Sequence, residues 1–161
     1  MNLHDLLHKF NLTSITLSAP FATAEIQFVS ADETAAWAMY VELITRSALQ
    51  ALSDEQGDEQ AALASIYSLF AMTRDILREY GRKGQAFSKI ALIVMNQILR
   101  PFTTKWHKNL GEEKTVPVHV KASFRKDLAA LQKELRKYAA LLAEMAKAED
   151  ISSLCYSDLE T

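Results

Sequence analysis

The most constraining feature of the sequence is a heptad pattern of apolar residues near its C-terminal end. Between about residues 120 and 148 the apolar positions are spaced 4, 3, 4, 3, 4 and 3 residues apart. This repeat predicts one long helix whose seam packs against other helices in a left-handed, coiled-coil-like way. The residues of the seam are Phe124, Leu128, Leu131, Leu135, Tyr138, Leu142 and Met145.

Three further long helices are predicted upstream, at about 31–52, 58–80 and 85–108. The first starts at a capping box, the SADE of residues 30–33. The third is apolar on nearly all sides over residues 90–95, which indicates a central place in a bundle, and Pro101 is expected to kink or restart it. The apolar positions expected to be buried in the first helix are Trp37, Tyr40, Val41, Ile44 and Leu52.

Two stretches near the N-terminus, 15–19 and 24–28, alternate apolar and polar residues and predict a β-hairpin at about 14–29, after a short helix at 2–10. The VPVHV of residues 116–120 fits either an edge strand or the first turn of the last helix, and we favour the helix. The predicted fold is therefore mainly α, an antiparallel four-helix bundle with a small N-terminal β-hairpin. Residues 1–150 form one domain, and 151–161 form a flexible tail.

Length and composition exclude several classes of protein. A chain of 161 residues can bury a core without disulfides, and its net charge of −2 does not attract nucleic acid over the whole surface. The single cysteine, Cys155, has no partner for a disulfide or a metal site, and no motif for a nucleotide or another common cofactor is present. Without a signal peptide or an apolar run long enough for a membrane, we expect a cytoplasmic protein with no cofactor and no metal.

A polar line on the third predicted helix is the feature most relevant to chemistry. Lys89, Asn96, Arg100, Thr103 and His107 fall within about 40° of one direction on an ideal helix. We interpret the line first as structural. Arg100 is then expected to pair with Asp75 or Glu79 of the preceding helix, while Trp106 and His107 pack at the helix end.

The spacing of Arg100 and His107 also resembles the loose R-x(4–6)-H signature of HEPN-type ribonucleases, which are helical bundles that usually dimerise. The resemblance implies a metal-independent endoribonuclease or toxin, in which the arginine acts on the scissile phosphate by its charge and the histidine as acid or base. The position after the arginine is usually polar in that family and is Pro101 here.

Other clusters of charged residues have simpler interpretations. Arg74, Arg78 and Arg82 recur every four residues on the second predicted helix and could bind phosphate or an acidic partner. A solvated face balanced by neighbouring acids is the interpretation we favour. His4 and His8 share a helical face but lack a third metal ligand, so no metal site is predicted.

Two segments, TRDILREYG (73–81) and FSKIALIVMNQILRPFTTKWHKNL (87–110), are similar to a group of small bacterial helical-bundle proteins in which an LRPF run is followed by WH. The resemblance implies a bacterial source and carries no activity. We expect a non-enzymatic protein-interaction module, an adaptor or regulatory subunit of the defence or toxin–antitoxin kind. The alternative is the ribonuclease using Arg100 and His107.

The predicted partner is another protein or a second copy of the chain, bound through the C-terminal helix or the hairpin edge. A helix of nearly 30 residues is long for this domain, so its end is expected to overhang and leave Leu142 and Met145 for that partner. RNA is a partner only under the ribonuclease alternative, and no membrane is expected.

Overall fold

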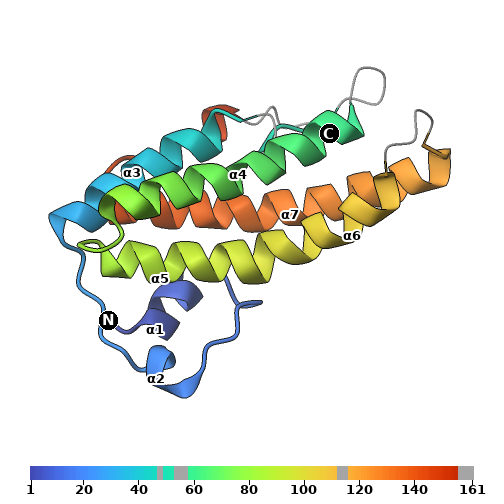
Figure 1. Ribbon diagram of the computed structural model, residues 1–161. Coiled ribbons are helices and arrows are strands. Elements are labelled where there is room, and N and C mark those ends of the chain that lie inside the picture. Colours follow the sequence, from blue (N-terminus) through green and yellow to red (C-terminus); the bar gives the residue numbers. More distant parts are fainter. Residues whose placement is uncertain (47–48, 53–57, 112–115, 156–161) are drawn as a thin grey trace.

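Four long helical segments form an antiparallel bundle in the computed structural model, which describes residues 1–46, 49–52, 58–111 and 116–155 (Figure 1). The first two segments are α3 (Ser30–Ile44) and α4 (Glu59–Tyr80). The third runs from α5 (Gln85–Val94) through the π-helix η2 (Met95–Leu99) into α6 (Arg100–Leu110), and the fourth is α7 (Val118–Met145). Helix α7 contacts α3, α4 and α6, so the prediction of a mainly helical bundle is confirmed.

Helix α3 is much shorter than the predicted 31–52, because it ends at Ile44. Leu49, beyond its end, is fully buried. The chain that follows α3 lies along α7, where the Gln132 amide donates to the Gln50 carbonyl at 2.9 Å and Arg125 donates to the Leu52 carbonyl at 3.2 Å. Side chains of α7 thus provide hydrogen-bond donors to backbone carbonyls in a stretch where the sequence predicted further helical turns.

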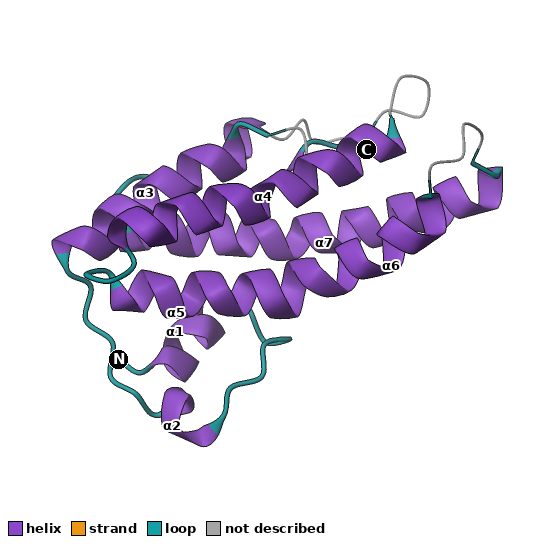
Figure 2. Cartoon of the chain, viewed as in Figure 1, coloured by secondary structure: helices purple, strands orange, loops and turns teal. Residues whose placement is uncertain are grey.

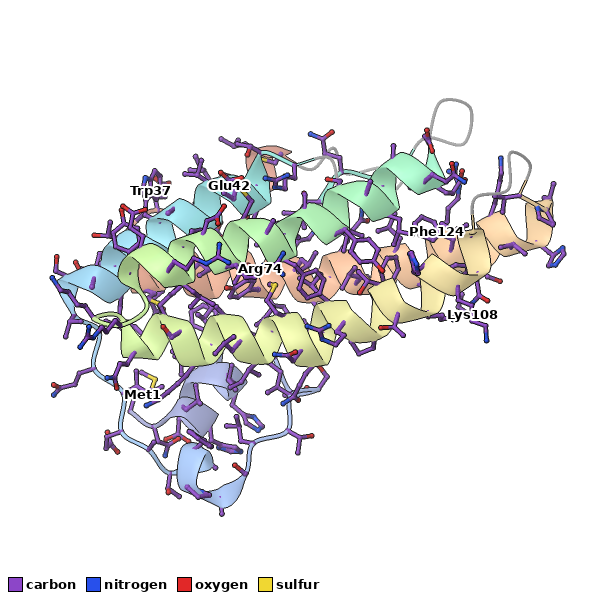
Figure 3. The ribbon with its side chains drawn as sticks, viewed as in Figure 1. Met1, Trp37, Glu42, Arg74, Lys108 and Phe124 are labelled. Carbon is purple, nitrogen blue, oxygen red and sulfur yellow. The ribbon has the colours of Figure 1, made fainter. Side chains whose placement is uncertain are left out.

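The buried face of α3 differs in part from the prediction. Tyr40 and Ile44 are buried as expected, but Trp37 is 47% exposed and Val41 lies at the surface. Figure 3 shows Trp37 at the outer edge of the helix. The sequence of α3 is apolar on nearly every side, so its pattern does not single out one buried face. The positions that α3 gives to the core are Ala35, Ala36, Met39, Tyr40, Leu43 and Ile44.

Helix α3 starts at a different residue from the predicted capping box. The N-cap is Val29, and Ser30 is already the first helical residue. Asp32, only 1% exposed, accepts a hydrogen bond from the Val29 amide at 3.0 Å and a second from the Phe87 amide at the start of α5, at 2.9 Å. Gly84 allows this approach, since a Cβ there would lie 3.1 Å from Asp32 Oδ1. One carboxylate therefore anchors the starts of two helices.

The third segment changes helix type just before Pro101, which lies in the first turn of α6 and so matches the predicted restart, while the helical path continues through it. Proline has no amide hydrogen to donate to the residue four positions earlier. The helix accommodates it with a π-turn just upstream, in which the Arg100 amide donates to the Met95 carbonyl, five residues back. A π-turn holds more residues than an α-turn, so the faces of α5 and α6 are rotated relative to one another.

The predicted β-hairpin at 14–29 is wrong. Figure 2 shows helices and loops throughout the described residues, and the N-terminal region holds α1 (Leu3–Lys9) and the short α2 (Ala19–Ala22). The second alternating stretch forms one isolated bridge, between Glu25 and Asn2. The first is held by Gln97, whose side chain accepts from the Thr16 amide and donates to the Thr16 carbonyl, both at 2.8 Å.

The start of α7 resolves the two alternatives for residues 116–120. Pro117 is the N-cap of α7, so this stretch belongs to the helix rather than to a strand. Val118, at the exposed start, is 85% accessible. The overhanging end of α7 is thus its beginning rather than its end.

The first residues after 150 are held against α3, although the sequence predicted a flexible tail from 151. Ser152–Cys155 forms a turn of 3₁₀-helix. The Tyr40 hydroxyl donates to Asp150 at 3.0 Å and accepts from the Ile151 amide at 2.8 Å. The rest of the predicted tail, 156–161, lies outside the described residues.

Candidate functional site

Arg100 and His107, the residues of the ribonuclease alternative, both lie exposed on α6 and contact aromatic rings of α4. The Arg100 guanidinium carbon is 5.2 Å from the centre of the Phe70 ring. The His107 ring meets the Tyr67 ring edge-on, with 6.0 Å between their centres. The two side chains therefore share one face of the molecule.

Tyr67 fixes the position of α4 on this face. Its hydroxyl donates to the Thr103 carbonyl of α6 at 3.2 Å, and its ring lies 6.4 Å from that of Phe70. Arg74 stands two helical turns beyond Tyr67 on the same side of α4, and Figure 3 shows it between the ribbons of α4 and α5. We call Tyr67, Phe70, Arg74, Arg100 and His107 the α4–α6 face.

The predicted polar line along the third segment is broken in the structure. Thr103 is buried, and Lys89 lines a pocket beside residues 16–18 rather than facing α4. The π-turn explains this, because it adds a residue between Lys89 and Arg100 and rotates the two parts of the helix. Only Asn96 remains beside Arg100, accepting from its Nε at 3.0 Å.

The predicted ion pair between Arg100 and Asp75 or Glu79 is wrong. Asp75 pairs instead with Arg78 on its own helix at 3.1 Å. Glu79 is hydrogen-bonded to the hydroxyl of Tyr80, which raises the pKa of that tyrosine. Within the described residues no carboxylate contacts Arg100, because Asn96 and Phe70 are its only polar and ring partners.

The basic cluster consists of Arg74 and Arg78 on α4 and Arg82 just beyond its end, and the neighbouring acids balance only part of it. Arg74, Arg78 and Arg82 are all exposed, and one of them is balanced by the Asp75 carboxylate. Arg74 and Arg82 have no partner among the residues that the structure describes. Arg74 therefore adds a free positive charge to the α4–α6 face.

A pocket of about 520 Å³ opens at the His107 end of the α4–α6 face. Tyr67, Leu63 and Ala64 of α4 form one wall, and His107 and Leu110 of α6 form the other. The mouth is polar, since the Gln60 amide lies 3.5 Å from the Gly111 carbonyl. The pocket extends the face with an apolar surface next to an imidazole.

The heptad seam is buried inside the bundle. All seven predicted residues, Phe124, Leu128, Leu131, Leu135, Tyr138, Leu142 and Met145, are 5% exposed or less. The expectation that Leu142 and Met145 overhang is wrong, because that end of α7 is covered by other parts of the chain. Lys9 pairs there with Glu144 at 2.6 Å, and Lys147 pairs with Glu33 at the start of α3.

The predicted packing of Trp106 and His107 at the helix end is found only for Trp106, which is 2% exposed. Its ring meets Phe124 edge-on at 5.2 Å, and its indole donates to Asp127 at 3.1 Å. His107, beside it in sequence, points away to α4 and remains exposed.

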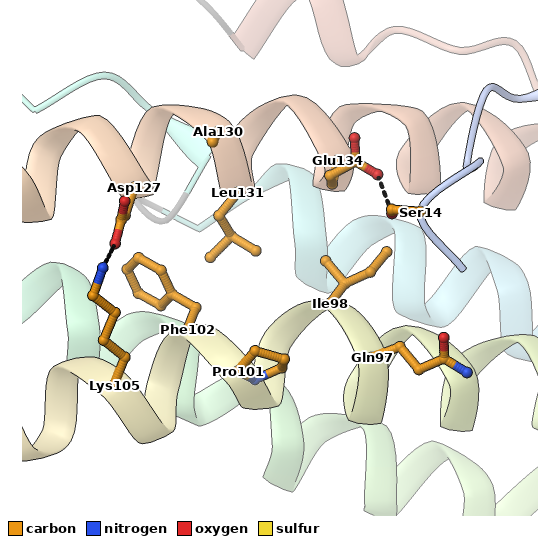
Figure 4. Close-up of a pocket in the computed structure, with 10 residues that line it drawn as sticks. All are labelled: Ser14, Gln97, Ile98, Pro101, Phe102, Lys105, Asp127, Ala130, Leu131 and Glu134. Carbon is orange, nitrogen blue, oxygen red and sulfur yellow. Dashed lines mark hydrogen bonds and ion pairs between the residues drawn. The ribbon is translucent and has the colours of Figure 1, made fainter. Parts of the chain in front are cut away.

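A second pocket, which the sequence did not predict, lies between η2–α6 and α7 (Figure 4). It measures about 350 Å³ and has an apolar floor that includes Phe102 and Leu131. Its charged side chains are already matched, since Lys105 pairs with Asp127 at 2.6 Å and Glu134 accepts from Ser14 at 3.3 Å. The only signal in the sequence is the small Ala130, which stands opposite Pro101 and leaves the space open.

The described residues contain no group of three side chains suited to hold a metal ion, and none of their helices has the length and apolar character needed to cross a membrane. The rings of His4 and His8 lie 4.5 Å apart and are tilted by 45°, and Asp5 lies 3.5 Å from His4.

The chain matches no protein-family model, and no curated protein or solved structure is detectably similar to it.

Proposed function

We propose that the protein is a non-enzymatic interaction module of the cytoplasm, which acts as an adaptor or a regulatory subunit. Its α4–α6 face binds an acidic segment of a partner protein. The two surfaces first expected to bind a partner do not remain: the seam is buried in the bundle, and the hairpin edge does not form. The α4–α6 face instead combines exposed rings with uncompensated positive charge.

The environment of Arg100 is the observation that carries the proposal. Its guanidinium lies over Phe70, and within the described chain its single hydrogen bond goes from Nε to the neutral Asn96. The charge is therefore not neutralised, and the two terminal nitrogens remain free to donate to a carboxylate in a bidentate way. Packing on a ring holds the side chain in place, which lowers the entropy lost on binding.

The neighbouring residues suit a protein surface. Tyr67 is partly exposed, and its hydroxyl is already satisfied by Thr103, so its ring offers contact area without a loss of hydrogen bonding. Tyrosine and arginine are the residue types enriched where binding energy concentrates at protein interfaces. Arg74 extends the positive charge along the same side of α4.

The proposal is tested with a fluorescein-labelled hexaglutamate peptide and fluorescence anisotropy at low salt. Arg100→Gln should weaken binding by about tenfold or more, since charge-assisted hydrogen bonds contribute about 1.5–3 kcal/mol each. Lys133→Gln is the control: it removes the same charge from an exposed position of α7, away from the face, and should change the affinity little. Equal weakening by both variants, or no binding by the wild type, would contradict the proposal.

A ribonuclease remains the second candidate, favoured by one observation. Arg100 and His107 are both exposed toward the same face, with no described carboxylate in contact with either. Incubation of the protein with total RNA in EDTA, beside a His107→Ala variant, tests it. Cleavage by the wild type alone would replace the interaction module with a metal-independent nuclease.

The geometry favours binding over cleavage. His107 lies seven positions after Arg100, about 10 Å along the helix axis, so both could act on one phosphate only after Arg100 leaves Phe70. The contact of His107 with the Tyr67 ring edge gives the imidazole no hydrogen bond that would orient it as a base. Binding of an acidic segment requires neither a movement of Arg100 away from Phe70 nor a hydrogen bond that orients the imidazole of His107.

A further inference from the structure

A small pocket lies on the other side of the third segment, between α5 and the N-terminal residues 16–21. Its volume is about 270 Å³. Leu17 and Phe21 form one wall, and Leu92 and Ile93 of α5 form the other. Lys89 stands among these apolar side chains. We call this pocket the α5 slot.

The walls of the α5 slot expose large apolar side chains to water. Phe21 is 50% exposed and Leu92 is 49% exposed. Each square ångström of apolar surface removed from water stabilises a complex, so a ligand that covers both residues is favoured by the hydrophobic effect. Because two elements of the chain form the walls, the ligand would be held from both sides.

Lys89 has no acidic partner. No described carboxylate contacts its ammonium group, and the slot is lined without an acidic side chain. The residues one helical turn away, at positions 85, 86, 92 and 93, are Gln, Ala, Leu and Ile. An uncompensated cation in an apolar wall selects a ligand with one negative charge on an apolar body.

We propose that the α5 slot binds a small monocarboxylate with an aliphatic or aromatic body of about ten non-hydrogen atoms. The size follows from the volume, which is just below the range of about 300–1,000 Å³ for drug-sized ligands. The carboxylate pairs with Lys89, and the body covers Phe21 and Leu92. This site does not depend on the α4–α6 face.

The α5 slot differs from the other pockets in this respect. In the pocket of Figure 4 the lysine is already paired with Asp127. The pocket at Tyr67 and the one lined by His4 and His8 have imidazoles as their only basic groups and hold no ammonium or guanidinium group. Only the slot combines apolar walls on two elements with a free ammonium group among the described pockets.

A ligand in the α5 slot would also hold the N-terminal segment in place. The polar contacts that tie residues 16–18 to the third segment are the two hydrogen bonds between Thr16 and Gln97. A bound molecule adds contacts between Phe21 and Leu92, so amide exchange across 16–22 should slow when it binds.

The test uses octanoate, which has ten non-hydrogen atoms, and 1-octanol as its neutral analogue. In ¹H–¹⁵N NMR titrations, octanoate should shift the amide resonances of residues 16–21 and 89–93, with a dissociation constant on the order of 1 mM or tighter for a ligand of this size. Lys89→Met should weaken octanoate about tenfold and leave octanol unchanged. Lys89→Arg should retain octanoate binding.

Two results would overturn the assignment. One is the absence of shifts in these residues up to 10 mM octanoate (about ten times the expected constant). The other is an equal affinity of wild type and Lys89→Met for octanoate, which would show that octanoate binds through its alkyl chain alone and that its carboxylate does not pair with Lys89. Lys89 is half-buried, and the dispersion of the amide resonances in the same spectra shows that each variant is folded.

Discussion

Replacing Asp32 by alanine should destabilise the protein strongly, because this buried carboxylate is the shared acceptor at the starts of α3 and α5. Hydrogen bonds to a charged group contribute about 1.5–3 kcal/mol each. The Phe87 amide is buried and would lose its partner without replacement by water, whereas the Val29 amide lies near the surface and can be rehydrated. The loss should therefore be about 3–4 kcal/mol, the larger part of it from Phe87.

The assay is urea denaturation followed by circular dichroism at 222 nm. A domain of this size has a free energy of unfolding of about 5–15 kcal/mol, so a loss of this size should shift the midpoint well outside experimental error. Asp32→Asn keeps one acceptor oxygen and should lose about half as much.

Ser30→Ala is the matched control, since the sequence alone assigns the cap to Ser30. In the structure Ser30 is the first residue of the helix, with Val29 as the N-cap, so this variant should change the free energy of unfolding by less than about 0.5 kcal/mol. If Ser30→Ala costs as much as Asp32→Ala, or if Asp32→Ala costs under 1 kcal/mol (well below one charged hydrogen bond, about 1.5–3 kcal/mol), the reasoning is refuted.

Three further variants probe the core and the tail. The Tyr138 hydroxyl is buried without a partner among the described residues, and burial raises its pKa, so Tyr138→Phe should keep or raise the free energy of unfolding, by up to about 1 kcal/mol in urea melts. Leu142→Glu should unfold the bundle rather than split an oligomer, which circular dichroism and light scattering distinguish. Burial, and next the hydrogen bond to Asp150, raise the pKa of Tyr40 to about 12. An unfolded tyrosine ionises near pH 10, so stability is present below that pH and is lost as the pH rises toward 12. Tyr40→Phe should lose less of its free energy of unfolding over this window than the wild type, measured by denaturation at pH 9, 10.5 and 12. An equal loss in the two proteins would contradict the assignment.

The long helices could be predicted from the sequence because burial and helical periodicity agree in them. The predicted limits 58–80 and 120–148 match α4 and α7 within a few residues, and each seam residue of α7 is in the core. Helix α3 illustrates the converse, since apolar residues on all its sides left both its end and its buried face undetermined.

The alternating residues of the N-terminal region correctly predicted which side chains are buried, but they wrongly predicted that the two stretches pair as β-strands. Ile15 and Leu17 are half-buried while Thr16 between them is exposed, as the pattern requires. Alternation reports only that an extended chain lies on a surface. Whether its backbone pairs with a strand or with a side chain such as Gln97 is decided by tertiary contacts that a local pattern does not contain.

The candidate site was predictable only in part: the sequence singled out its basic residues, but not Tyr67 and Phe70, whose rings meet Arg100 and His107 across two helices. The sequence singled out Arg100 and His107, and both are exposed on one helix face. Their contact with the rings of α4, and the separation of Lys89 from them, depend on a π-turn that proline favours but that an ideal helical wheel cannot represent.

The first 29 residues form an extra layer of the same core as the long helices, since Leu3, Leu6, Leu7 and Leu12 are buried in it. They lie outside the four long helices, against α5 and the end of α7 (Figure 1), with Lys9 and Ser14 reaching across to Glu144 and Glu134. This placement explains why α5 can be apolar on nearly every side, because the N-terminal residues cover a side that the other three long segments leave open. A protease that cut near Val29 would remove this layer and with it part of the core, so the shortened bundle should expose apolar side chains and aggregate.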